Sequence, residues 1–359
     1  MAKILLFSDI HVHPHKRSAE RLQDCLKCLN WCFETAKELC VDFVLFGGDL
    51  LHERQKIDSY TFTEVFKVLE KNQNSGFKTY LLLGNHDMWF ASNWSVNSIY
   101  PFGCLQNFET ITETKEIAIG NSNWHFMPYT HDPIKELDNL PREKINQSYF
   151  LGHVAIDGSK LNSSGSLSDV VIEHDGDMVK VDKKFFSDYI HAFFGHYHSA
   201  QKLAKNVEYI GSPLQLSFGE AHESKHIILL DTDTNKMKYI ENKFSPKHFY
   251  IKDTDIDNYD QDLLSSSFVC ILSENTIDNQ QKKEIEKKLE NLNVSSLQIR
   301  QQTQKMQEHV LHDAKSIIAD ESTMIKKYVE QIKPSGLIIE DLVSLGMDIV
   351  NFQPAELGD

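Results

Sequence analysis

Three short apolar segments near the start of the chain, separated by helical patterns, constrain the fold more than any other feature. They are KILLFSD (residues 3–9), VDFVLFGGD (41–49) and KTYLLLGNHD (78–87). Between them, residues 18–40 and 58–73 repeat apolar side chains at the spacing of an amphipathic helix. Strands that are apolar at nearly every position belong to sheets covered on both faces. This order therefore predicts a βαβαβ unit around a parallel sheet.

The pattern changes twice further along the chain. From residue 108 short strands follow one another, which extends a mixed α/β sandwich to residue 243. Residues 248–300 have the strand and helix pattern of a small α/β domain. Over residues 301–359 apolar residues repeat at helical spacing, and Pro334 and Gly336 interrupt this pattern. We therefore expect three parts, over residues 1–243, 248–300 and 301–359.

Composition favours an intracellular globular protein. The 359 residues are 41% hydrophobic and 25% charged, which is ordinary for such a chain. No apolar run is long enough to span a bilayer, and the N-terminus lacks a signal-peptide pattern. We expect a cytoplasmic protein with reduced cysteines and no membrane contact. Cys25, Cys28 and Cys32 lie on the apolar stripe of a predicted helix, so core packing is the better interpretation of their spacing.

Five predicted strands end on side chains that can bind a metal ion. Sites in open α/β sheets form outside the carboxyl ends of strands, so these side chains are expected to meet. In FFGHYHS (193–199), positions i and i+2 of an extended segment share a face, and His196 and His198 should converge on one point. The candidate ligands are Asp9, His11, Asp49, Asn85, His153, His196 and His198.

This donor set indicates which ions the site would take. Oxygen and imidazole ligands without cysteine suit manganese, iron or zinc better than a thiolate-rich structural zinc site does. Seven ligands are too many for one ion, but two ions that share a carboxylate would use them all. Such a pair is a standard arrangement for phosphoryl transfer.

The order of these motifs resembles that of the calcineurin-like metallophosphoesterases over residues 1–220. The resemblance implies a four-layer α/β/β/α sandwich and a pair of divalent metal ions that activates a water molecule. It implies that Asp9, His11, Asp49 and His198 hold the first ion, and that Asp49, Asn85, His153 and His196 hold the second. His86 would stabilise the transition state or protonate the leaving oxygen. Asp87 would orient His86 or cap a following helix, and we expect the cap.

Two further features resemble one branch of this family, the SbcD-type DNA repair nucleases of the meiotic recombination eleven family. His52 stands where protein phosphatases of the superfamily have an aspartate, and VEYIGSPLQLSFGE (207–220) follows the last metal motif. The resemblance implies a manganese-dependent exonuclease and endonuclease in double-strand-break repair and recombination. Magnesium, iron or zinc are alternative metals. His52 would support catalysis or act by holding a metal ligand.

The layout of that family also implies partners. Residues 248–300 would be a capping domain, and residues 301–359 would bind the coiled coil of an SbcC-type ATPase, although these helices could instead pack on their own core. A homodimer is expected, and the short chain resembles bacteriophage versions, which work in the host cytoplasm. The net charge of −15 opposes free DNA binding, which normally needs an excess of lysine and arginine. The ATPase could supply that surface.

Alternatives remain for the activity and for the surface residues. The chain could hydrolyse cyclic nucleotides or small phosphodiesters, or it could be a structural subunit whose catalysis is dispensable. Trp89, Phe90 and Trp94 could stack on a base, but aromatic residues at this spacing more often pack under a loop or at a dimer contact. The segment His13 to Arg17 could contact phosphate, although a solvated loop is the simpler interpretation.

Overall fold

The computed structural model describes residues 2–14, 19–90, 93–141, 143–160, 179–221, 223–259, 261–273, 275, 277–290 and 294–301. The helices predicted beyond residue 301 lie outside the described residues, as do His15, Lys16 and Arg17. None of the helices in the described part of the chain has both the length and the apolar character that a membrane span requires.

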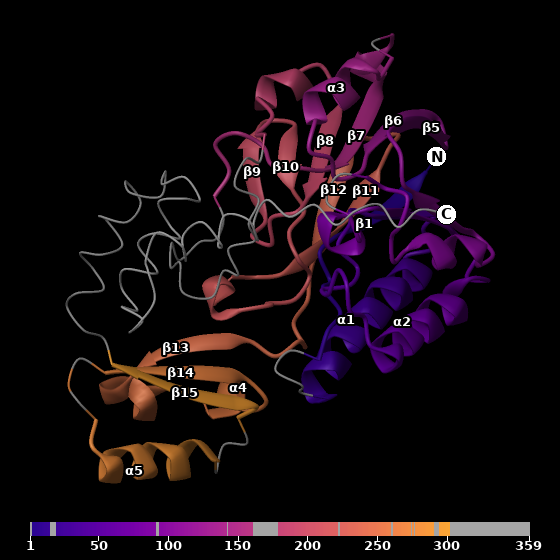
Figure 1. The fold of residues 1–359 in the computed structure, drawn as a ribbon. Coiled ribbons are helices and arrows are strands. Elements are labelled where there is room, and N and C mark those ends of the chain that lie inside the picture. The colour runs from indigo at the N-terminus through magenta and orange to yellow at the C-terminus, as the bar shows by residue number, and fades with distance from the viewer. Residues whose placement is uncertain are drawn as a thin grey trace, which may run out of the picture. The chain divides into compact units, whose positions relative to one another are not determined.

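The first sheet contains the predicted βαβαβ unit. Its six strands follow the order β12-β11-β1-β2-β3-β4. Figure 1 labels β12, β11 and β1 of this sheet. The parallel strands are β1 (Lys3–Phe7), β2 (Phe43–Phe46), β3 (Lys78–Leu82) and β4 (Phe108–Ile111). Two antiparallel strands complete the sheet, β11 (His226–Asp231) and β12 (Lys236–Glu241). Each of the first three strands ends before the polar residues of its predicted segment.

Two long helices cover one face of this sheet. They are α1 (Ala19–Glu38) and α2 (Ser59–Asn72). α2 begins where it does because Asp58 caps it, with Oδ1 accepting a hydrogen bond of 2.8 Å from the Thr61 backbone N–H. The apolar stripe of α1 packs on the sheet and includes the three cysteines, all of which are buried. Their predicted role in the core is confirmed.

The second sheet packs against the other face of the first. Its order is β5-β6-β7-β8-β10-β9. The strands are β5 (Lys115–Ile119), β6 (Ser122–Met127), β7 (Ser148–His153), β8 (His191–Gly195), β9 (Gln201–Ala204) and β10 (Val207–Tyr209). Between the sheets, Ile4 and Leu45 of the first sheet belong to the same core cluster as Trp124 and Phe193 of the second.

A thin outer layer covers the far face of the second sheet. It contains α3 (Pro133–Asp138) and two short 3₁₀ helices, η4 (Ile145–Gln147) and η5 (Lys183–Phe186). Leu137 and Phe186 of this layer share a core cluster with Phe150 and Phe194 of the sheet. The layers therefore run helix, sheet, sheet, helix, which confirms the predicted fold class. The sequence analysis had not identified α3 or β9.

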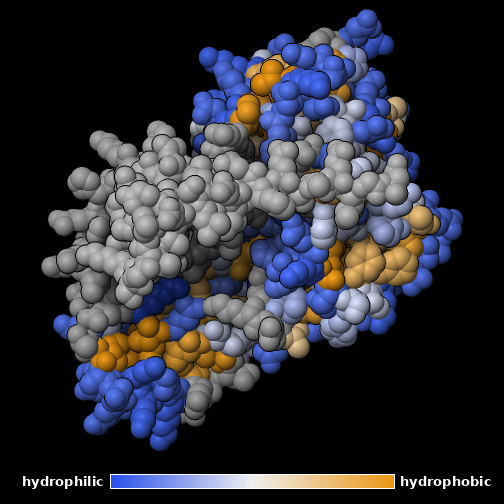
Figure 2. Space-filling model, in the orientation of Figure 1, coloured by the Kyte–Doolittle hydropathy of each residue, from blue (hydrophilic) through white to orange (hydrophobic). Residues whose placement is uncertain are grey.

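A third, smaller sheet lies within residues 248–301. Its strands are parallel: β13 (His248–Lys252), β14 (Phe268–Ser273) and β15 (Ser296–Gln301). Two helices accompany it, α4 (Gln261–Leu264) and α5 (Asn279–Glu290), and Leu264 and Leu289 are buried in its core. Figure 2 shows hydrophilic side chains gathered over α5 and hydrophobic ones beside it. The small α/β pattern expected for residues 248–300 is present.

Candidate metal centre

The candidate ligands all lie at the carboxyl ends of strands from the two large sheets. Asp9 and His11 follow β1, Asp49 follows β2, and His153 is the last residue of β7. Asp9 (φ 55°), His11 (φ 48°) and Asp49 (φ 60°) have positive backbone φ angles. This left-handed region is uncommon for residues other than glycine and collects at functional sites. The sharp turns at these strand ends bring the polar side chains together.

His196 and His198 do not converge on one point, so that prediction is wrong. β8 ends at Gly195, and the φ of 99° at His196 breaks the extended backbone that the prediction assumed. His198 instead groups with Asp9 and His11, and His196 groups with Asp49 and His153. The two imidazoles therefore serve neighbouring donor groups.

The first donor group consists of Asp9, His11 and His198, whose ligand atoms all lie within 4.8 Å of one another. The Nε2 atoms of His11 and His198 are 3.0 Å apart. Two nitrogens bound to one ion at about 2.1 Å and at right angles would be about 3.0 Å apart. The spacing therefore fits two ligands of a single metal ion.

The second donor group consists of Asp49, His153 and His196, again within 4.8 Å of one another. Asn85 belongs with them, because its Oδ1 lies 3.0 Å from His153 Nε2 and 3.0 Å from His196 Nδ1. This group thus offers two oxygen and two nitrogen donors, and it contains every residue that the family resemblance assigns to the second ion.

Asp49 lies between the two groups. Its Oδ2 is 3.4 Å from His11 Nε2 and 3.2 Å from His153 Nε2, so one oxygen faces an imidazole of each group. Its Oδ1 accepts a 2.8 Å hydrogen bond from the backbone N–H of His86. A carboxylate placed in this way can bridge two ions.

The second ring nitrogen of three histidines has its own partner. His153 Nδ1 lies 2.7 Å from the Gly47 carbonyl oxygen, and His198 Nδ1 lies 3.2 Å from Glu220 Oε1. His11 Nδ1 is 3.3 Å from His52 Nδ1. The carbonyl oxygen and the carboxylate are acceptors, so they hold a proton on Nδ1 of His153 and His198 and leave the Nε2 lone pair for a metal. In the His11–His52 pair either ring nitrogen can be the donor. Lone pairs that face one another at 3 Å repel unless a proton or a metal ion lies between them. Where the ring proton is held on Nδ1, a metal ion can take that place, so the donor set fits divalent metal ions.

Burial and neighbouring charges shift the pKa values of the donor groups in both directions. Burial and the neighbouring His86 lower the pKa of His11 well below its usual range, which favours the neutral imidazole that a metal requires. Burial raises the pKa of Asp9, although His153 partly opposes this. Burial alone would raise the pKa of Asp49, but the surrounding imidazoles, His153 foremost, lower it well below its usual range. Asp49 is therefore held as a carboxylate.

His86 and His52 lie beside the donor groups. His86 Nδ1 is 2.5 Å from the carbonyl oxygen of His52, which places the proton of the neutral ring on Nδ1 and directs Nε2 elsewhere. The two rings stack with centroids 5.3 Å apart. His11, His52 and His86 also form a third group of possible donor atoms within 4.8 Å, but it shares His11 with the first.

We had expected Asp87 to cap a following helix, and this prediction is wrong. Its carboxylate accepts hydrogen bonds from the backbone N–H groups of Asp49 (2.9 Å), Leu50 (3.1 Å), Leu51 (3.3 Å) and Gly84 (3.1 Å). The backbone turns extended directly after Asp87, at Met88. Asp87 therefore fixes the loop that carries Asp49.

Two glycines leave the space that the centre needs. A Cβ atom at Gly84 would overlap Asp49 Oδ1, and a Cβ atom at Gly48 would overlap His153 Nδ1. Gly48 also has a φ of 104°, which side-chain-bearing residues rarely adopt. The glycines before Asp49 and Asn85 are thus required by close approach to the ligands themselves.

The surface aromatic residues divide into two kinds. Trp94 packs on the core, and its Nε1 donates a 2.7 Å hydrogen bond to the Tyr129 carbonyl oxygen, which confirms the packing interpretation for this residue. Trp89 and Phe90 are each 45% exposed.

His13 lies next to Glu53, with 3.2 Å between Nε2 and Oε1.

Sequence reasoning missed two residues that contact the centre. Glu220 lies within the segment 207–220 that drew attention, but nothing in its spacing connected it to His198. Lys225 was not identified at all, and its Nζ donates a 2.9 Å hydrogen bond to the carbonyl oxygen of His198. Both contacts depend on a loop fold that has no periodic signal.

The layered fold and the paired oxygen- and imidazole-rich groups are those of a metal-dependent phosphoesterase. Residues 2–227 match the family model described as calcineurin-like phosphoesterase. The chain belongs to this family, whose members are hydrolases that use divalent metal ions.

Named relatives cover both general phosphoesterases and nucleases. The chain is 23% identical over 249 residues to "Putative phosphoesterase 244L" of Invertebrate iridescent virus 6, covering 66% of this chain and 79% of that one. It is 24% identical over 279 residues to the SbcD component of the nuclease SbcCD of Escherichia coli strain K12, covering 67% of each. It is 20% identical over 205 residues to "Exonuclease subunit 1" of Enterobacteria phage T4, covering 54% of each.

Proposed function

We propose that this protein is a two-metal DNA nuclease that hydrolyses phosphodiester bonds, as the nuclease subunit of an SbcCD-like complex in DNA end processing and repair. The observation that supports a pair of ions is the position of Asp49 Oδ2 between His11 and His153, at 3.4 and 3.2 Å. A single carboxylate oxygen shared between two groups of donors is expected where two ions lie close together.

Manganese is the proposed metal. The donors are carboxylate, amide and imidazole groups, which suit manganese, iron or zinc, with magnesium as a further alternative. When bound, the two ions would lower the pKa of a water molecule and neutralise charge on the phosphoryl oxygens. Asp9, His11, Asp49 and His198 would hold one ion, and Asp49, Asn85, His153 and His196 the other.

His86 is the proposed proton donor. In hydrolysis a water oxygen bonds to phosphorus, and the bond from phosphorus to the leaving sugar oxygen breaks. That oxygen needs a proton. Because Nδ1 of His86 donates to the His52 carbonyl oxygen and the His86 backbone N–H donates to Asp49 Oδ1, Nε2 is the ring atom placed to deliver a proton. Delivery requires the doubly protonated imidazolium, which becomes the neutral ring with its proton on Nδ1 once the leaving oxygen has taken the proton from Nε2. His52 would act mainly by holding Nδ1 of His11.

The DNA substrate is supported by the relatives whose names describe nucleases. Hydrolysis of cyclic nucleotides or small phosphodiesters is the second candidate, because another relative is named only as a putative phosphoesterase. A third candidate, a structural subunit with dispensable catalysis, is less favoured because every expected donor residue lies in the centre.

A comparison of substrates separates the first two candidates. The full chain is incubated with manganese and with linear duplex DNA, single-stranded DNA, a cyclic nucleotide or bis(p-nitrophenyl) phosphate, with and without its ATPase partner. We expect nucleotide release from DNA that stops on addition of a chelator. Turnover of the small esters in manganese while both DNA substrates stay intact, with and without the ATPase, would contradict the nuclease proposal.

The proposed partners follow from the same branch of the family. Residues 248–300 would act as a capping domain, and residues 301–359 would bind the coiled coil of an SbcC-type ATPase. A homodimer would present two active sites to DNA ends. A pull-down of the full chain and of a chain ending at residue 301 with the ATPase tests the binding segment, and light scattering tests the dimer. Equal retention of the ATPase by both chains would show that the segment after residue 301 is not needed for binding.

A further inference from the structure

We propose that Lys225 is a positioning residue of the metal centre, which acts through Glu220 and the backbone of His198 to fix the ring nitrogen that His198 presents to the first donor group. The inference rests on the proposed metal pair. It assigns a role to a residue that touches neither a metal nor the substrate.

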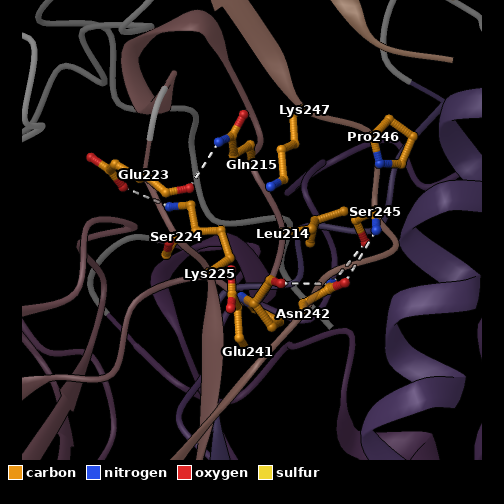
Figure 3. Close-up of a pocket in the computed structure, with 11 residues that line it drawn as sticks. Leu214, Gln215, Glu223, Ser224, Lys225, Glu241, Asn242, Ser245, Pro246 and Lys247 are labelled. Atoms are coloured by element: carbon orange, nitrogen blue, oxygen red, sulfur yellow. Dashed lines mark hydrogen bonds and ion pairs between the residues drawn. The ribbon is translucent and has the colours of Figure 1, made fainter. Parts of the chain in front are cut away.

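Lys225 is a buried ammonium group with three acceptors. Its side chain is 5% exposed. Nζ lies 2.6 Å from Glu220 Oε2, 2.9 Å from Glu223 Oε2 and 2.9 Å from the carbonyl oxygen of His198. An ammonium group has three donors, and here each donor has an acceptor. Burying a lysine is costly unless it is paired in this way. Figure 3 shows Lys225 next to Glu223 at the edge of a pocket, with the contact between them marked.

Glu220 divides its two oxygens between the lysine and the histidine. Oε2 is held by Lys225 and also accepts a hydrogen bond of 3.2 Å from the Leu216 backbone N–H. Oε1 faces His198 Nδ1 at 3.2 Å. Glu220 is 2% exposed, so water does not compete for the hydrogen bonds to its two carboxylate oxygens. Two donors on one oxygen, Lys225 Nζ and the Leu216 N–H, fix the orientation of the other oxygen toward His198.

The same cluster holds the backbone of His198. Its carbonyl oxygen accepts from Lys225 Nζ and also from the Ser212 backbone N–H at 3.0 Å. Glu223, the third member, accepts a 2.6 Å hydrogen bond from the hydroxyl of Ser199, the next residue in the chain. His198 is therefore held at its ring and at its carbonyl oxygen, and the next residue, Ser199, is held by its hydroxyl group.

The charge of Lys225 explains why a lysine stands here. Lys225 Nζ lies between the carboxylates of Glu220 and Glu223, 2.6 and 2.9 Å away, and compensates charges that would otherwise repel each other. With Oε2 held by the ammonium, Oε1 of Glu220 accepts the hydrogen bond from His198 Nδ1. Nε2 of His198 then keeps its lone pair toward His11, 3.0 Å away.

Manganese binding to the full chain tests this role without reference to activity. We compare the wild type with Lys225→Met, Lys225→Arg and, as a matched control, Lys202→Met at an exposed lysine. Calorimetric titration with Mn²⁺ alone gives the affinities, and electron paramagnetic resonance distinguishes paired from single manganese ions. We expect Lys225→Met to weaken one of two binding steps by about 10- to 100-fold. Lys225→Arg, which retains the charge, should recover most of the loss, and Lys202→Met should bind like the wild type.

Unfolding by urea in the presence of a chelator separates positioning from general stability. If Lys225→Met lowers only the free energy of unfolding and binds two manganese ions like the wild type, the proposal is wrong. If that variant does not fold, Glu220→Gln makes the same test, because glutamine retains the volume and an acceptor oxygen but lacks the charge that pairs with Lys225. Wild-type affinity in Glu220→Gln would then overturn the proposal. A wild-type protein that fails to bind two ions would contradict the proposed function instead.

Discussion

The Nε2 atoms of His11 and His198 face one another at 3.0 Å, and the other nitrogen of each ring has a separate partner. Two nitrogens arranged in this way repel unless a proton or a metal ion lies between them. The residues that hold the second ring nitrogens therefore contribute to a cation site as well as the ligands themselves. Substitutions of ligands and of these supporting residues should have different effects.

Replacement of Asp49 should affect both ions at once. Asp49→Asn keeps the volume but removes the charge from the one oxygen that faces both donor groups. We expect manganese affinity to fall by more than about 100-fold at both steps, with DNA hydrolysis abolished. Calorimetric titration measures the affinities. Asp188→Asn, at an exposed aspartate, is the control, and normal binding of two ions by Asp49→Asn would show that Asp49 does not bridge them.

Replacement of His86 should separate chemistry from metal binding. His86→Ala removes the proposed proton donor but no proposed ligand, so we expect the rate of DNA cleavage to fall by about 100-fold or more while two manganese ions still bind. Single-turnover cleavage and metal titration measure the two properties. His131→Ala, at an exposed histidine, should leave both unchanged. Cleavage at the wild-type rate by His86→Ala would remove this residue from the mechanism.

Replacement of His52 should reduce metal affinity, since His52 Nδ1 lies 3.3 Å from His11 Nδ1. We expect His52→Ala to weaken one manganese step by about tenfold. His52→Gln should weaken it less, because the amide oxygen can accept the proton of His11. If both variants lose cleavage with unaltered metal affinity, His52 acts on the substrate and does not support His11.

Replacement of Asp87 should lower stability even without metal. Asp87→Ala leaves four backbone N–H groups near the centre without their acceptor, and we expect a loss of about 3 kcal/mol in the free energy of unfolding. Urea denaturation in a chelator measures it. Asp58→Ala, which removes the cap of α2, should cost only about 1 kcal/mol. Equal losses in the two variants would mean that the Asp87 contacts contribute little.

The periodic features of the sequence predicted the fold well, because periodicity reflects local burial. The predicted helices over residues 18–40 and 58–73 correspond to α1 (Ala19–Glu38) and α2 (Ser59–Asn72). The carboxyl ends of parallel strands meet at one edge, so the expected ligands could be gathered from their positions alone.

Contacts made by irregular backbone could not be predicted in this way. The rule for alternate residues failed at His196 because the strand ends one residue earlier. Glu220 and Lys225 reach His198 across 22 and 27 positions, through a loop whose path depends on many weak interactions. The cap predicted for Asp87 depended on its neighbours in sequence, whereas three of its four donors follow β2.

Gly48 and Gly84 imply a limit on how this centre can change. The Asp49 and His153 side chains occupy the space that a methyl group on either glycine would need. In a saturation library scored by metal content, alanine at these two glycines should therefore be as damaging as loss of a ligand, although neither glycine offers a donor atom. Such a library would identify the residues that leave space for the ligands as well as those that supply donor atoms.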